Sequence, residues 1–183
     1  MKKLLTILFV TVLIFGTSSL LHTAQAQVEE GEIKLGAGLA FGTGVFDGGG
    51  DLDNDIGIRI DGYYAVTPEI RAGADFTFYF PKSVGNVDAT VWELNFNGNY
   101  IFLDEDGLIV YGIGGLNITG INIDSESVNG FGGSASESEF GLNLGAGLEY
   151  ALDFADFFAE AKLGNLGGDA NQFALGAGLR FPI

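Results

Sequence analysis

Residues 173–181 read FALGAGLRF, and this stretch alternates between two kinds of side chain. Its odd-numbered residues are phenylalanine, leucine or alanine, whereas its even-numbered residues are alanine, glycine or arginine. Successive side chains of a β-strand point to opposite faces, so this alternation predicts a strand with one apolar face. Two further phrases, LGAGLAF at 35–41 and LGAGLEY at 144–150, repeat the pattern. The sequence therefore predicts several strands of the same kind.

The paired glycines of these phrases do not form a nucleotide-binding loop. A dinucleotide fingerprint needs a third glycine three residues after the second, between a strand and a helix. That position holds Phe41, Tyr150 and Phe181 in the three phrases. The sequence also has no G-x-x-x-x-G-K-[ST] motif, so it gives no support to phosphate binding.

The first 26 residues have the features of a secretory signal peptide. Lys2 and Lys3 precede an apolar run and the small-residue cleavage sequence TAQA. The apolar run is too short for a comfortable membrane-spanning helix, which argues against an uncleaved anchor. We predict a Sec-type signal at residues 1–26, removed by cleavage, and a single domain at residues 27–183.

The mature chain lacks the residues that many catalytic and metal sites use. The single histidine, His22, lies in the predicted signal peptide, and the chain has no cysteine. Disulfides, thiol or imidazole catalysis and His/Cys metal sites are therefore excluded. Two of the eight basic residues, but none of the 24 acidic ones, lie in the signal peptide, which leaves a net charge of −18. Such a charge excludes nucleic acid as a partner.

Alternation with a period of two continues along the mature chain and predicts eight strands. The expected strands are residues 32–42, 55–66, 70–80, 90–102, 108–119, 140–150, 157–163 and 173–181. The segment 108–119 is apolar on both of its faces, so the pattern assigns it no inward side.

The connections between these strands alternate in length. Long, polar, glycine-bearing connections are expected at 44–54, 81–89 and 122–139, short turns at 67–69, 103–107 and 152–156, and a last hairpin of modest length at 164–171. Long loops at one end and short turns at the other are typical of outer-membrane barrels.

The charged residues within the predicted strands indicate which face is enclosed. Apart from the first residue of each strand, five basic and five acidic residues fall on the face opposite the apolar one: Lys34, Arg59, Asp61, Arg71, Asp75, Glu93, Glu149, Glu160, Lys162 and Arg180. Equal numbers of opposite charges suit a closed interior, where an unpaired charge is costly. Eight strands leave a lumen just wide enough for side chains. We therefore predict an all-β fold, an eight-stranded antiparallel up-and-down transmembrane β-barrel with these ten residues in an interior charge network.

Glycine and aromatic residues have definite places in such a barrel. The glycines of the LGAGL phrases would point inward and leave room for long neighbours such as Arg180 and Glu149. Aromatic residues near the strand ends would form girdles at the membrane boundaries. We expect Phe41, Phe80, Trp92 and Phe140 at the loop end and Tyr64, Phe102, Tyr150, Phe157 and Phe181 at the turn end. The alternative is that these aromatic residues fill the core of a soluble protein.

With these features the mature chain resembles the small eight-stranded outer-membrane barrels, the OmpA/OmpX-like family. The most specific feature is the last strand, FALGAGLRF, which looks like the family's C-terminal insertion signal, although Pro182 and Ile183 follow its final aromatic residue. The resemblance implies a monomer in the outer membrane of a Gram-negative bacterium, in contact with outer-membrane lipid and lipopolysaccharide and recognised by the barrel-assembly machinery. Enzymes of the family use histidine-dependent sites, so we predict no enzymatic activity and no cofactor.

Two groups of acidic residues have alternative interpretations. Glu93, Glu149 and Glu160 could act as paired carboxylates, as in glycosidases, but a salt-bridge network with the interior basic residues is the favoured interpretation. Residues 51–55, DLDND, have the oxygen spacing of a calcium loop, but they lack its turn glycine and its final glutamate. We expect a solvated acidic loop there, with at most weak divalent binding, and no metal site.

The sequence leaves three functions open. The first is a barrel with a plugged, charge-paired lumen and a structural or surface-interaction role through acidic extracellular loops. The second is a narrow porin-like channel for small solutes, which a conductance measurement would separate from the first. The third is a secreted soluble barrel that binds an apolar ligand and needs no detergent.

Overall fold

A computed structural model of the protein describes residues 28–43, 54–84, 87–128, 131–167 and 171–183. These residues form nine β-strands: β1 (Ile33–Thr43), β2 (Asn54–Thr67), β3 (Ile70–Tyr79), β4 (Lys82–Val84), β5 (Val87–Glu105), β6 (Leu108–Val128), β7 (Phe131–Ala151), β8 (Asp156–Leu166) and β9 (Gln172–Pro182). The described part of the chain contains no helix long and apolar enough to cross a membrane.

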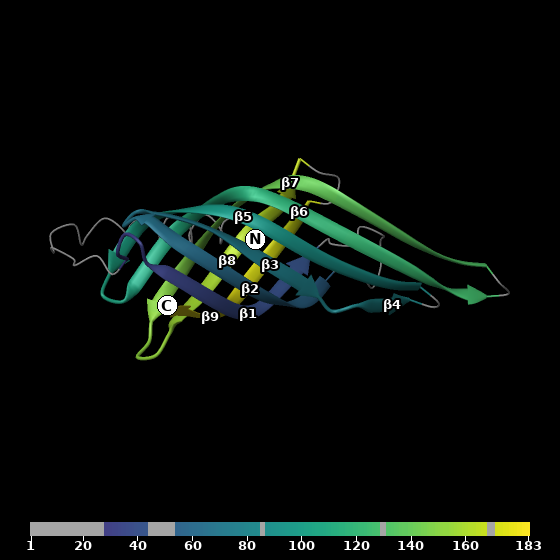
Figure 1. The fold of residues 1–183 in the computed structure, drawn as a ribbon, viewed down its shortest axis with the longest axis horizontal. Coiled ribbons are helices and arrows are strands. Elements are labelled where there is room, and N and C mark those ends of the chain that lie inside the picture. The colour runs from purple at the N-terminus through teal and green to yellow at the C-terminus, as the bar shows by residue number, and fades with distance from the viewer. Residues whose placement is uncertain (1–27, 44–53, 85–86, 129–130, 168–170) are drawn as a thin grey trace, which may run out of the picture.

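Eight of the strands form a closed antiparallel barrel (Figure 1). Neighbouring strands pair in chain order, β3 pairs directly with β5, and β1 pairs with β9 to close the ring. The predicted all-β, eight-stranded up-and-down barrel is thus confirmed. The ninth strand, β4, differs from the prediction, because it lies within the expected connection 81–89, where it pairs with the first residues of β5.

Short turns join the strands at one end of the barrel, which we call the turn end. Asp106 and Gly107 connect β5 to β6, with φ of 51° and 86°. Positive φ at both central residues is the type I′ turn, whose twist matches a tight hairpin and which glycine adopts without strain. The C-terminal Ile183 lies at the same end, where its backbone nitrogen donates to the carbonyl oxygen of Ile33.

Strands β6 and β7 continue well beyond the ring at the opposite, loop end. Each has 21 residues, and together with β4 and the start of β5 they extend past the other strands (Figure 1). We call this extension the projecting sheet and define it as β4 with residues 87–91, 120–125 and 133–138. The connection predicted at 122–139 is therefore wrong where the structure describes it, because those residues are paired strands.

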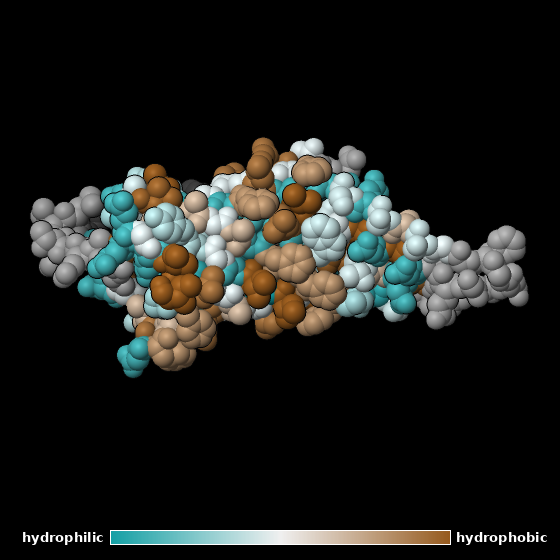
Figure 2. Space-filling view, viewed as in Figure 1, coloured by the Kyte–Doolittle hydropathy of each residue, from teal (hydrophilic) through white to brown (hydrophobic). Residues whose placement is uncertain are grey.

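The barrel wall separates apolar from polar side chains as the alternation predicts. Along β1, for example, Leu35 and Leu39 are exposed on the outside, whereas Lys34 is buried inside. Brown, hydrophobic side chains cover the middle of the wall in Figure 2, and the hydrophilic colour increases towards the projecting sheet. The outer surface of the wall is therefore suited to lipid.

Strand β6 has apolar side chains on both faces because the part of the barrel interior that it faces is apolar. Its inward residues Ile109, Tyr111 and Ile113 join a buried apolar cluster near the turn end. Val28, from the segment before β1, completes this cluster with Ala65 and Ile101, and its backbone nitrogen donates to Asp104. One part of the barrel interior is thus apolar, which removes the contrast between the two faces of β6.

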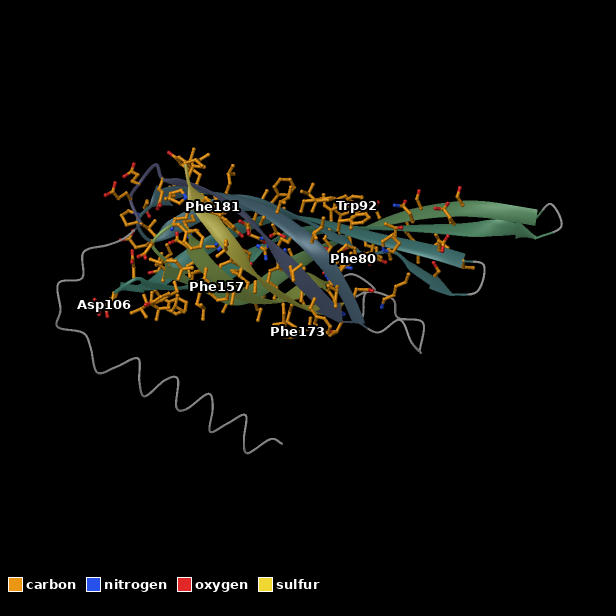
Figure 3. All side chains as sticks on the ribbon, turned by 90° about the horizontal axis from the view of Figure 1, so that it is seen from below. Phe80, Trp92, Asp106, Phe157, Phe173 and Phe181 are labelled. Carbon is orange, nitrogen blue, oxygen red and sulfur yellow. The ribbon has the colours of Figure 1, made fainter. Side chains whose placement is uncertain are left out.

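Aromatic residues lie on the outside towards both ends of the wall. Figure 3 places Phe157 and Phe181 near Asp106 at the turn end, and Phe80 and Trp92 nearer the loop end. The Trp92 ring is stacked on Phe76, with ring centroids 6.2 Å apart. These are the positions at which a girdle would meet the membrane boundaries.

Candidate functional site

The barrel interior holds most of the charge of the wall, and it is the candidate functional site. All ten residues of the predicted charge network are buried: Lys34 on β1, Arg59 and Asp61 on β2, Arg71 and Asp75 on β3, Glu93 on β5, Glu149 on β7, Glu160 and Lys162 on β8, and Arg180 on β9. Their exposed fractions lie between 0% and 6%. Seven strands thus contribute charged side chains to one enclosed space.

Arg180 lies at the centre of this space. Its two terminal nitrogens are 2.9 Å from Asp61, 2.5 Å from Glu149 and 2.7 Å from Glu160. The guanidinium also faces the Phe158 ring, with 4.1 Å between its carbon and the ring centroid. A planar guanidinium with five donors can bind several carboxylates at once, so one residue of β9 links β2, β7 and β8.

Arg59 extends the network towards the loop end. It pairs with Glu160 at 2.6 Å and contacts Asp61 and Asp75 at 3.3 Å each. Lys162 adds a second positive charge to Asp75, with its Nζ 3.2 Å from the carboxylate. Each of these carboxylates is thus compensated by at least one buried cation, as a low-dielectric interior requires.

Arg71 and Lys34 extend the network towards the turn end. Arg71 pairs with Glu149 at 2.8 Å and stacks on the Tyr111 ring, with 4.7 Å to the centroid. Lys34 lies 3.4 Å from Glu149 and 2.7 Å from Asp156. Asp156 was not among the predicted site residues because the sequence pattern placed it in the turn at 152–156, whereas β8 begins with it.

Glu32, just before β1, also contacts this end of the network. Its carboxylate is 3.7 Å from Lys34. Burial raises the pKa of Glu32 above its ordinary value, and the Lys34 charge opposes this shift without cancelling it.

Glu93 differs from the other acidic residues of the set. In the described part of the chain it has no ion-pair partner, and it accepts hydrogen bonds from Gln172 and Tyr79 instead. Gln172 was not among the predicted site residues because the sequence analysis began the last strand one residue later.

A cluster of buried amides, which was not predicted from the sequence, fills the space beside Asp75. Asn95 and Asn97 donate to the two oxygens of Asp75, at 2.8 and 2.7 Å. Asn117 and Asn143 each donate to the Asn95 carbonyl oxygen at 2.7 Å. Alternating asparagines at 95 and 97 on the charged face were the available signal.

Inward glycines make room for these side chains. A methyl group at Gly36 would overlap the carboxylate of Asp61 and the stem of Arg180. A methyl group at Gly147 would overlap the Tyr111 ring. The LGAGL phrases therefore place their small residues where large interior side chains cross the lumen.

The interior arrangement is suited to holding charges together rather than to catalysis. Glu149 and Glu160 both accept hydrogen bonds from Arg180, which leaves neither as a free acid or base. A small cavity of about 10 Å³, lined in part by Arg59, Glu93 and Lys162, has room for about one water molecule. No group of three acidic or histidine side chains that could hold a metal ion occurs among the described residues.

The acidic stretch 51–55 is only partly described. Residues 51–53 lie outside the described residues. Asp55 is buried, and one of its oxygens is 2.7 Å from Lys82 Nζ. The expectation of weak divalent binding at this stretch therefore remains an expectation.

Comparison with known proteins identifies a family with this architecture. Residues 10–181 match the family model described as the outer membrane protein beta-barrel domain. No curated protein matched the chain.

Several solved structures share the fold. Ail, the attachment invasion locus protein of Yersinia pestis, is 23% identical, with 83% of this chain and 99% of Ail aligned at a TM-score of 0.59. OprG of Pseudomonas aeruginosa is 15% identical, with 85% and 97% aligned at a TM-score of 0.64. The N-terminal barrel domain of OprF from the same organism is 20% identical, with 85% and 100% aligned at a TM-score of 0.55. At these identities the likeness concerns the fold alone.

Proposed function

The chain belongs to the outer membrane protein β-barrel domain family, and from that premise we propose that it is a closed, non-conducting barrel with a structural and surface-interaction role. It is an outer-membrane protein of a Gram-negative bacterium, as the family indicates. In this proposal the barrel anchors acidic extracellular segments in the membrane, and its charge-paired interior stabilises the wall. We also propose that the protein has no enzymatic activity.

The observation that carries the proposal is the continuous pairing of charges across the lumen. The chain of contacts runs from Asp156 through Lys34, Glu149 and Arg180 to Glu160. Arg59 continues it to Asp75, beside which the amide cluster lies. Ions would have to break several buried pairs to pass, and each broken pair leaves an uncompensated charge. This supports a plug made of side chains rather than a pore.

The surface role is supported by where charge is exposed. Asp88 and Asp124 face each other on adjacent strands of the projecting sheet, and both are exposed. Outer-membrane barrels carry their longer connections on the extracellular side, so this end would face the environment. Ail, which shares the fold, is named for attachment and invasion. We propose a comparable surface role for this chain, with an extracellular partner.

The proposed membrane partners follow from the wall. Its exposed apolar side chains would contact outer-membrane lipid and the acyl chains of lipopolysaccharide. We propose that the barrel inserts as a monomer with the help of the barrel-assembly machinery, after cleavage of residues 1–26.

Single-channel recording tests the proposal directly. The purified barrel, reconstituted in a planar bilayer, should give no steady current, whereas Arg180→Ala, which opens the centre of the network, should conduct or fail to fold. Heat-modifiable migration of both proteins on a gel reports whether each one is folded. A steady current through the folded wild-type barrel would support the alternative, a narrow channel for small solutes.

A further inference from the structure

In the projecting sheet, the polar and apolar faces are reversed relative to those of the barrel wall. On the side that continues the lipid-facing surface, the projecting sheet carries polar residues: Asp88, Thr90, Asn122, Asp124, Ser134 and Ser136. On the side that continues the lumen, it carries the apolar residues Val87, Ala89, Ile121, Ile123 and Ala135, together with Lys82 of β4, which is in register with Ala89. We call these the outer face and the inner face. Directly paired residues of adjacent strands point to the same side, so the cross-strand register fixes this assignment.

The inner face is an apolar strip that begins buried and ends exposed. At its base, Val91 packs with Ala40 and Tyr79 in a buried cluster, and Ile121 packs against it. Further out, Val87 and Ile123 are 39% and 42% exposed. The polar outer face shows that this part of the sheet lies outside the hydrocarbon region, so lipid does not cover the strip. An apolar surface continuous with a buried cluster and open to water is typical of a docking site.

The charge around the strip limits what can dock there. Glu137 is exposed on the inner face, in register with Ile121. Asp88 and Asp124 lie on the other side of the same strands. Five of the six basic residues after residue 26 are buried in the lumen, and the sixth, Lys82 on the inner face, has its charge paired with Asp55. A second copy, which without residues 1–26 carries the same net charge of −18, and any polyanion would both be repelled.

We propose that the inner face of the projecting sheet docks a cationic amphipathic polypeptide segment. Its apolar side chains would cover Ile123 and Val87, and its basic side chains would approach Glu137 on the same face. This inference rests on the proposed surface role and names the class of partner. It distinguishes the chain from Ail, which has been crystallised with the heparin analogue sucrose octasulfate, a polyanion.

A fluorescent synthetic peptide of alternating leucine and lysine is a suitable probe, because its alternation matches the period of a strand. The full barrel is placed in nanodiscs of zwitterionic lipid, and empty nanodiscs report binding of the peptide to lipid. Anisotropy titration should detect saturable binding to the barrel. A peptide of alternating serine and lysine should bind about tenfold more weakly, because it has no apolar side chains to bury.

Variants on the two faces localise the binding. Ile123→Ser on the inner face should weaken the leucine–lysine peptide about tenfold, whereas Asn122→Ser, its neighbour on the outer face, should leave the affinity within about twofold. Glu137→Gln should weaken binding and reduce its dependence on salt. Equal loss in the Ile123 and Asn122 variants, equal affinity for both peptides, or binding of sucrose octasulfate in place of the cationic peptide would overturn the proposal.

The outcome is separable from that of the conductance test. A barrel that conducts ions and binds the peptide would overturn the closed lumen and leave the docking surface in place. A closed barrel that binds neither peptide would overturn the docking surface and leave the closed lumen.

Discussion

The barrel wall and the projecting sheet use the same strands with opposite sidedness. On β5, the residues on one side of the strand change from Phe96 and Leu94 in the wall to Thr90 and Asp88 in the projecting sheet. On the other side, Asn97 and Glu93 in the wall give way to Ala89 and Val87. The backbone alternation continues without interruption between Val87 and Ile101. The medium on each side of a sheet, rather than the strand itself, therefore decides which face is apolar.

The exchange occurs at one row of the sheet. Trp92, Gly120 and Ser138 are directly paired across β5, β6 and β7. A methyl group at Gly120 would overlap the Trp92 indole, so the glycine lets the ring lie flat across its neighbour. An amphipathic indole is suited to the boundary between hydrocarbon and water. This row therefore marks where the wall ends and the projecting sheet begins.

The largest expected effect comes from breaking the interior of the wall. Arg59→Leu leaves Glu160 and Asp75 less compensated and should destabilise the barrel by about 3–5 kcal/mol. Glu93→Leu removes a carboxylate that has no ion pair among the described residues, and it should cost less, about 1–3 kcal/mol. Guanidinium titration in phospholipid vesicles, followed through the fluorescence of the single tryptophan, Trp92, measures both. Wild-type stability in both variants would contradict the network interpretation.

The second prediction compares a lysine introduced on the outer surface of the barrel wall with one introduced on the outer face of the projecting sheet. Ile60 is 59% exposed in the middle of β2, where lysine should cost roughly 2–4 kcal/mol because the side chain faces hydrocarbon. Asn122→Lys, on the outer face of the projecting sheet, should change stability by less than about 0.5 kcal/mol. The same unfolding titration compares the two variants. A similar cost at both positions would mean that the membrane boundary lies elsewhere.

The third prediction compares two glycines. Gly36→Ala should destabilise the barrel by about 1–3 kcal/mol, since the new methyl group overlaps Asp61 and Arg180. Gly133→Ala, in the projecting sheet, meets no atom within 4 Å and should be nearly neutral. A neutral Gly36→Ala variant would show that the interior side chains can shift without cost.

The smallest effect concerns Glu32 at the turn end. Its raised pKa means that the folded barrel binds this proton more tightly than the unfolded chain does. The associated stabilisation is present below the ordinary pKa of 4.5 and is lost as the pH rises through the higher folded-state value. Glu32→Gln should therefore lose less stability than the wild type between about pH 4 and pH 8. Identical pH dependence in the two proteins would argue against burial as the cause.

The sequence pattern predicts a strand and its sidedness where each face of the strand meets a single environment. In β1, β2 and β9 the lipid side is apolar and the lumen side is small or charged, so the alternation alone gives the strand and its sidedness. Strand β6 was ambiguous because Ile109 and Ile113 face an apolar cluster that residue Val28 completes from a distant part of the sequence. No local pattern contains that contact.

The projecting sheet was missed for a related reason. The stretch from Asn122 to Ser138 is rich in serine and acidic residues, which usually indicate a loop. Its few apolar residues, Ile123 and Ala135, fall on the side opposite to the apolar side of the wall. The alternation also could not predict which interior acid pairs with which base, because ring closure and strand register decide these contacts.

The position of Arg180 has a consequence for the order of assembly. Arg180 and Asp61 are 119 residues apart in the chain, and Lys34 and Glu149 are 115 apart. Contacts of such high sequence separation form late, since the long intervening chain must first be brought together. Until β9 reaches β1, the carboxylates of the half-made sheet lack their central counter-ion. Burial of the lumen and closure of the ring between β9 and β1 should then occur together, and β9 becomes the strand that commits the barrel to the membrane.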